Sequence, residues 1–206
     1  SELGMTGFSV NNVTILEFDF VAQSDEMSFW YTFGSMEYTG YTCSSFNDVF
    51  GFFISGPEIA GPYSNDAVNI ALVPDPTIWM VDATGDFIGV VDENLFTNTP
   101  VAVNTVNNGD PNEDWGGQCE SLDPDWESYN TYWIDNDYSG TGWQGVNTPP
   151  DPEFTVEGLT GFTVPLPAYI NNLVCDSTYH IKLAIADCAD GILNSAAFLE
   201  ANSFSS

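Results

Sequence analysis

The chain contains many short segments with the residue pattern of β-strands, and this feature restricts its possible folds most. Val13–Phe20 alternates as V-T-I-L-E-F-D-F, which places Glu17 and Asp19 on one face. Clusters of Gly, Pro, Asn or Asp bound the segments, as is typical of strands joined by turns. The other predicted strands are Met27–Phe33, Asp48–Ser55, Val68–Val73, Val101–Val106, Gly161–Leu166, Thr178–Ala186 and Ala196–Phe204.

These segments together predict the fold class. No window shows a sustained apolar period of about 3.6 residues, so helices should be few and short. Many short strands separated by loops predict an all-β fold, an antiparallel β-sandwich or jelly-roll. The length of 206 residues suits one all-β domain, so we expect residues 1–206 to form a single unit. Gly109–Pro152 alternates little, and we predict a long loop excursion there with one short hairpin at Tyr129–Ile134.

Acidic residues far outnumber basic ones. Asp and Glu number 30 against one Lys, which gives a net charge of −29. Nucleic acid and anionic lipid both require basic residues, so neither is an expected partner, and no apolar run is long enough to insert into a membrane. The mutual repulsion of the carboxylates must be relieved by salt or by bound cations. Calcium, which prefers carboxylate oxygens, is the predicted cation; a solvated acidic surface adapted to salt water is the alternative.

The cysteines indicate disulfides and not a metal–thiolate site. No C-x-x-C pair occurs, and the single histidine, His180, cannot complete a zinc site. An even number of cysteines in a chain of extracellular composition predicts two disulfides, and the sequence does not choose among the three possible connectivities. The cysteines are Cys43, Cys119, Cys175 and Cys188.

Two long blocks of the sequence resemble a known family. The first, Ile15–Pro57, contains I-L-E-F-D-F-V, S-F-W-Y-T-F-G-S-M-E-Y and C-S-S-F-N-D-V-F-G-F-F-I-S-G-P. The second, Thr178–Ser206, begins T-Y-H-I-K-L-A-I-A-D-C-A-D-G. Together with N-I-A-L-V-P at Asn69–Pro74, these blocks are similar to the choice-of-anchor L domain of bacterial surface proteins, which is common in Bacteroidetes. The resemblance implies an extracellular β-sandwich and says little about a ligand.

The first candidate calcium ligands are Glu37, Asn47 and Asp48. They lie at the end of one aromatic segment and at the start of the next, in S-M-E-Y and F-N-D-V-F. Carboxylate and amide oxygens that meet at loop ends are what a hard cation binds. The alternative is that Asn47 and Asp48 only cap a turn through hydrogen bonds to the backbone.

Two further groups of oxygen-bearing side chains are candidates. Asp187 and Asp190 lie with Asn194 between two apolar segments, where a solvated turn is the alternative to calcium. Asp110, Asn112 and Asp114 repeat the D-x-N-x-D opening of a calcium loop. The glycine of that loop comes late, and Ser121 stands where a glutamate is expected.

The excursion carries four tryptophans, which we consider as contacts to a partner or as a sugar-binding platform. Packing onto the sandwich is the alternative, since Trp is enriched in interfaces of every kind. The residues are Trp115, Trp126, Trp133 and Trp143. Elsewhere, Lys182 and His180 share one face of a predicted strand, and we expect Lys182 to pair with carboxylates.

No catalytic motif is present. The sequence has no G-x-S-x-G, no H-E-x-x-H and no P-loop. Glycoside hydrolysis requires a pair of carboxylates, but in so acidic a chain the presence of such a pair does not indicate this activity. We expect a non-catalytic, extracellular adhesion or structural domain that calcium stabilises and that assembles with copies of itself or with neighbouring surface domains. A carbohydrate-binding adhesin module with glycans as ligands is the alternative, and a glycoside hydrolase is a remote one.

Overall fold

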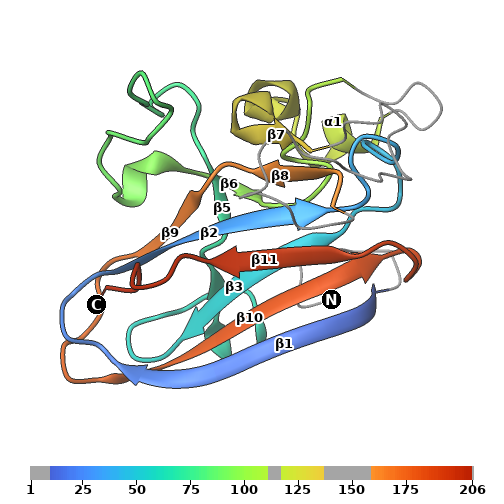
Figure 1. Ribbon diagram of the computed structural model, residues 1–206. Coiled ribbons are helices and arrows are strands. Elements are labelled where there is room, and N and C mark those ends of the chain that lie inside the picture. Colours follow the sequence, from blue (N-terminus) through green and yellow to red (C-terminus); the bar gives the residue numbers. More distant parts are fainter. Residues whose placement is uncertain (1–9, 111–116, 137–158, 206) are drawn as a thin grey trace.

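The computed structural model describes residues 10–110, 117–136 and 159–205. Two antiparallel sheets pack against each other (Figure 1). One has the strand order β1, β10, β3 and β4, formed by Val10–Val21, Thr178–Cys188, Val49–Ser55 and Val68–Asn69. The other has the order β11, β2, β8 and β7, with β9 also beside β2; its strands are Ser195–Leu199, Met27–Ser35, Gly161–Thr163, Trp133–Asp135 and Leu166–Ile170.

The remaining elements are short. β5 (Leu72–Pro74) and β6 (Phe96–Pro100) form a separate antiparallel pair. The helices are α1 (Gln118–Leu122) and the 3-10 turns η1 (Ser64–Asp66), η2 (Glu93–Leu95) and η3 (Trp126–Tyr132). The prediction of an all-β antiparallel sandwich with few short helices is confirmed.

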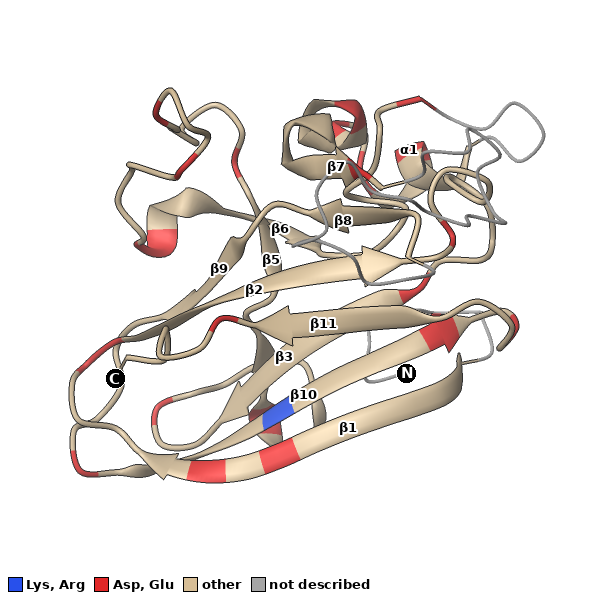
Figure 2. Ribbon diagram, in the orientation of Figure 1, with Lys and Arg blue, Asp and Glu red and all other residues tan. Residues whose placement is uncertain are grey.

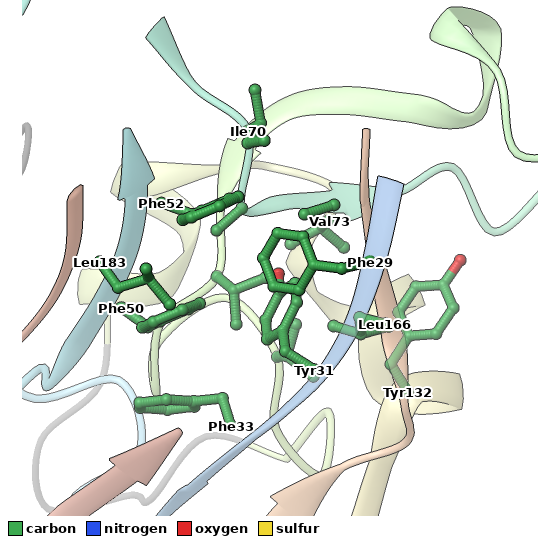
Figure 3. Packing of buried hydrophobic residues seen from close by; sticks show 14 of the residues in the cluster. Phe29, Tyr31, Phe33, Phe50, Phe52, Ile70, Val73, Tyr132, Leu166 and Leu183 are labelled. Atoms are coloured by element: carbon green, nitrogen blue, oxygen red, sulfur yellow. The ribbon is translucent and has the colours of Figure 1, made fainter. Parts of the chain in front are cut away.

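Aromatic side chains fill the space between the two sheets. Alternate residues of β2 point inward, and Phe29 meets Phe52 of β3 with ring centroids 4.3 Å apart (Figure 3). Tyr31 meets Phe50 at 5.0 Å, and Leu183 of β10 belongs to the same cluster. Burying each such side chain contributes about 1.5–3 kcal/mol, so this aromatic cluster holds the two sheets together.

β3 is buried on both faces, which explains why its sequence is an apolar run and not an alternation. Phe50 and Phe52 face the space between the sheets. Phe53 points to the outer side, where its ring lies 4.9 Å from that of Tyr63, and it packs with Ala67. The segment that follows β3 therefore covers the outer face of the sheet.

The strand predicted over Val68–Val73 is divided between β4 and β5, which lie in different sheets, and the one predicted over Ala196–Phe204 ends at Leu199. Two other predicted elements are of the wrong kind. Val101–Val106 is a buried turn and not a strand, because the Thr105 hydroxyl accepts a hydrogen bond from the Ala102 amide at 2.9 Å and donates to the Pro100 carbonyl at 2.8 Å. The predicted hairpin at Tyr129–Ile134 is instead the end of η3 followed by β7.

The side chains of η3 explain that second difference. Trp126, Tyr129 and Tyr132 are buried and lie three residues apart, which is the repeat of a 3-10 helix. The Tyr132 hydroxyl donates to the Pro74 carbonyl at 3.0 Å and fixes η3 against β5. Only the residues after Tyr132 are extended, and they pair with β8.

Candidate metal centre

Carboxylates from both sheets converge at one end of the sandwich. Glu37 follows β2, and Asp48 directly precedes β3. Asp187 is the penultimate residue of β10, whose chain then turns and begins β11 at Ser195. Because Ser195 pairs with Ser35 at the end of β2, this turn brings the end of the first sheet against the end of the second.

Asp48 is fully buried, and only one of its two carboxylate oxygens has a hydrogen-bond donor. Oδ2 accepts from the Ser195 hydroxyl at 2.5 Å. Oδ1 is buried and has no hydrogen-bond partner. A buried oxygen without a donor is costly, so the site at Asp48 Oδ1 is incomplete as the described residues stand.

Glu37 lies beside Asp48 and is 2% exposed. Its carboxylate accepts from the Asp48 amide at 3.4 Å, and its own amide donates to the Ser35 hydroxyl at 3.0 Å. These contacts fix Glu37 in the interior, although a carboxylate is rarely buried without a compensating charge.

Asp187 is also largely buried, and Asn12 holds it in place. The Asn12 amide group donates to Asp187 Oδ2 at 3.0 Å and to the Gly191 carbonyl at 3.0 Å. This residue therefore ties β1 to the turn between β10 and β11. Asn12 was missed by sequence reasoning, as was Ser195, because polar residues at strand ends are common and carry no specific signal.

The pKa values of these carboxyl groups reflect their burial and mutual repulsion. Burial, followed by the charge of Asp48 and then those of Asp190 and Asp187, raises the pKa of Glu37 to about 9. Burial also raises the pKa of Asp48 to about 7, with Asp187 and Asp190 adding to the rise and hydrogen bonds from Ser195 and from the Cys188 backbone opposing it. The pKa of Asp187 is raised too, mainly by burial. The charged forms of all three groups lack a counter-charge here.

The proximity of these groups does not by itself amount to a formed ion site. Among the described residues, no three His, Cys, Asp or Glu side chains lie in an arrangement that would hold a metal ion. Glu37, Asp48 and Asp187 lie near one another without forming such a group, so a cation here would need backbone carbonyls and water as most of the 6–8 oxygen ligands that calcium takes.

The other predicted metal ligands are placed differently. Asn47 Oδ1 accepts from the Asn104 amide at 2.8 Å, which is the turn-capping alternative. Asp190 accepts from the Ile192 amide at 3.3 Å within its own turn. Asp110 is exposed, while Asn112 and Asp114 lie outside the described residues. The structure thus brings together Glu37, Asp48 and Asp187, with Asp190 close enough for its charge to raise the pKa of Glu37 and of Asp48. The Asn47 amide oxygen is instead bonded to the Asn104 amide.

The two described tryptophans of the excursion pack onto the sandwich. Trp126 is 5% exposed and lies in the main core, and Trp133 packs against that core with its ring 6.1 Å from Tyr38. Trp115 and Trp143 lie outside the described residues. For Trp126 and Trp133, packing is the alternative that the structure supports.

One of the two predicted disulfides is confirmed. Cys43 and Cys119 are bonded and tie the loop after β2 to α1. The second predicted disulfide is wrong, because Cys175 is exposed and Cys188 is buried, both as free thiols. Cys175 precedes β10 and Cys188 ends it, so an extended strand with a rise of about 3.3 Å per residue separates two residues that a disulfide would need within about 7 Å.

The basic residues lie far along β10 from this cluster. Figure 2 shows the single blue segment, Lys182, in β10 amid red segments, and Lys182 pairs in register with Glu17 of β1. His180 Nδ1 lies 2.8 Å from Asp19 Oδ1, and His180 Nε2 lies 3.7 Å from Glu17 Oε1. These side chains accompany the carboxylates of β1 and not those of the buried cluster.

The comparison with protein families identifies the domain. The family model of the choice-of-anchor L domain matches residues 2–205. The chain belongs to the choice-of-anchor L domain family. No curated protein and no solved structure gives a significant match. Choice-of-anchor domains are structural domains of cell-surface or secreted proteins. Among the described residues, no helix is long and apolar enough to cross a membrane.

Proposed function

We propose that this choice-of-anchor L domain is a non-catalytic, calcium-stabilised domain of an extracellular surface structure, where it serves adhesion or assembly. The observation that carries the proposal is the buried pair Glu37 and Asp48, in which Asp48 Oδ1 has no hydrogen-bond partner among the described residues. Two adjacent buried carboxylates are stable only when protonated or when they share a cation. Calcium supplies that cation outside the cell.

The location of the pair explains why the cation would stabilise the whole sandwich. Glu37 belongs to the sheet of β2, and Asp48 and Asp187 belong to the sheet of β3 and β10. An ion held by these oxygens would join the ends of both sheets and the turn that leads to β11. It would also offset part of the repulsion that a net charge of −29 imposes on the folded state.

A non-catalytic role is supported by family membership, since choice-of-anchor domains are structural domains of cell-surface or secreted proteins. A glycan-binding surface is not favoured by Trp126 and Trp133, since both pack onto the sandwich. Adhesion or assembly through a protein contact is the better-supported role.

Thermal unfolding with calcium and with excess chelator tests the proposal. A ligand that binds only the native state stabilises it by about 2.7 kcal/mol at a concentration of 100 times its Kd, which corresponds to a rise in Tm of roughly 5–10 °C for a domain of this size. We expect this rise for the unmodified protein and its loss in Asp48→Asn.

The matched control is Asp110→Asn, which removes one carboxylate from the other candidate calcium loop. We expect this variant to keep the full rise in Tm. An unmodified protein whose Tm is the same in calcium and in chelator would refute the proposal. A rise abolished by Asp110→Asn and kept by Asp48→Asn would place the ion elsewhere and would equally contradict it.

A further inference from the structure

β1 forms an edge of the four-stranded sheet, and no strand lies on its outer side in the described part of the chain. From Thr14 to Val21 it pairs with β10 without a register shift. Its other edge therefore presents a regular row of backbone N–H and C=O groups. Ile15 and Leu16 are 48% and 54% exposed. A long, apolar edge strand of this kind is a template for another strand.

An apolar groove runs between β1 and β11, the edge strands of the two sheets. One part, with a volume of about 200 Å³, is lined by Phe18, Leu183, Leu199 and Phe204 among others. The adjoining part, of about 150 Å³, is lined by Leu16 and again by Leu183 and Leu199. Figure 1 shows both edge strands on the same side of the sandwich. The core is therefore open to solvent along this side.

The two faces of β1 differ in chemistry. Leu16 and Phe18 face the groove, while the alternate residues Glu17 and Asp19 face the opposite side next to His180. The side chains of Glu17 and Asp19 are 49% and 66% exposed. A strand added beside β1 would thus meet apolar side chains on one face and carboxylates on the other.

We propose that the β1 edge and this groove bind an extended segment of a neighbouring surface protein in which apolar residues alternate with Lys or Arg. This inference rests on the proposed function in surface assembly and names the partner's chemistry. The added strand would continue the sheet through backbone hydrogen bonds, and its apolar side chains would close the groove. Its basic side chains would lie opposite Glu17 and Asp19, where opposite charges stabilise cross-strand pairs.

Charge excludes a second copy of this chain as the favoured occupant. Antiparallel pairing of two β1 strands would bring the Glu17 and Asp19 side chains of both copies together on one face, and like charges across a strand pair are destabilising. The chain has a net charge of −29 and contains one Lys and no Arg. It therefore has no strand in which apolar and basic residues alternate. The complementary strand must come from a different protein.

Synthetic peptides test this proposal on the full chain in the presence of calcium. The probe is a peptide of about nine residues, within the usual range of about 3–10 residues for a strand, in which Val alternates with Lys. N-methyl groups on one edge prevent the peptide from pairing with itself. The comparison peptide carries Glu in place of Lys. By isothermal titration calorimetry we expect the Val–Lys peptide to bind at least roughly tenfold more tightly, with a difference that shrinks at high salt.

Two variants locate the binding surface. Leu16→Lys places a charge in the groove, and we expect it to lower the affinity for the Val–Lys peptide by at least a factor of about ten. The matched control is Ile192→Lys, at a position that is 77% exposed and lies outside the groove, and it should bind as the unmodified protein does. Replacing both Glu17 and Asp19 by Lys should reverse the preference in favour of the Val–Glu peptide. Circular dichroism confirms that each variant is folded.

Three results would overturn the proposal. The first is equal binding of both peptides, and the second is binding of neither. The third is dimerisation of the unmodified protein in the absence of peptide, measured by analytical ultracentrifugation and abolished by Leu16→Lys. That result would mean that the β1 edge binds a second copy of the chain. The calcium proposal is tested separately by the unfolding of Asp48→Asn, which leaves β1 and the groove unaltered. Failure of one proposal is therefore distinguishable from failure of the other.

Discussion

At the scale of single residues, Glu37, Asp48 and Asp187 differ from the other described acidic side chains in being buried. Most described carboxylates are solvated or accept hydrogen bonds within their own turns, as Asp82 does from Thr84. Asp48 Oδ1 accepts none. Because the cost of an unsatisfied buried oxygen is about 1–3 kcal/mol, and more for a charged group, a cation or a proton at this atom should stabilise the folded state.

The pH dependence of the calcium-free protein follows from these two groups. The pKa of Glu37 rises from 4.5 to about 9 on folding, so between these values the folded state holds a proton that the unfolded state has released. The free energy of unfolding must then fall as pH rises through this window. Asp48, with a pKa raised to about 7, acts in the same direction over the lower part of the window.

Urea denaturation in chelator across that pH range measures the effect. We expect Glu37→Gln, which cannot ionise, to lose much less stability with rising pH than the unmodified protein. Added calcium should flatten the pH dependence of the unmodified protein, because the bound ion favours the ionised carboxylates. Stability that rises with pH in chelator would show that the pair is not buried as described.

The sequence predicted the carboxylates of the site but not its other residues. Glu37, Asp48 and Asp187 were predicted from their positions at strand ends, where both sheets of a sandwich have to turn. For Asn47 the sequence left calcium binding and turn capping open, and its amide oxygen accepts a hydrogen bond from the Asn104 amide. The contributions of Asn12 and Ser195 depend on contacts across more than a hundred residues, which a pattern in a single sequence does not contain.

At the scale of elements, the Cys43–Cys119 disulfide fixes α1 to the loop that carries Glu37 and Asp48. It closes a sequence separation of 76 residues, and a disulfide of this kind contributes about 2–4 kcal/mol. We expect Cys119→Ser to lower the free energy of unfolding by this amount in urea denaturation. Cys175→Ser is the matched control, since that thiol is exposed and free, and it should leave stability nearly unchanged.

The thiol count provides a second check on the same element. Alkylation of the denatured protein without reductant should add two groups to the intact mass, one each at Cys175 and Cys188. An unmodified mass would mean that both remaining cysteines are also paired. Four added groups would mean that the Cys43–Cys119 bond does not form.

Strands could be predicted from sequence where their two faces differ in polarity or where both faces are apolar. They could not be predicted where tertiary contacts determine the backbone conformation. β1 and β2 follow their alternating patterns, and β3 follows its apolar run. Val101–Val106 has strand-forming residues, but the hydrogen bonds of Thr105 close it into a turn. The segment that begins at Trp126 does not alternate as a strand does. Its aromatic residues recur every three positions, but this spacing indicates a 3-10 helix only once the structure shows that all three side chains are buried.

At the scale of the whole molecule, the net charge of −29 makes bound cations and basic partners the two natural means of stabilising the domain and its assemblies. We propose the buried pair at one end of the sandwich as the place of the cation and the β1 edge as the place of the basic strand. The second of these adjoins the aromatic core, since Phe50, Phe52 and Leu183 line the groove beside β1.

Anomalous diffraction from crystals grown with calcium would locate the ion. We expect an anomalous peak at bonding distance, about 2.3–2.6 Å, from Asp48 Oδ1, with an oxygen of Glu37 or Asp187 as a further protein ligand. The same crystals soaked in chelator should lose the peak. A calcium-saturated crystal in which Asp48 Oδ1 has no ion beside it would show that this carboxylate does not bind calcium.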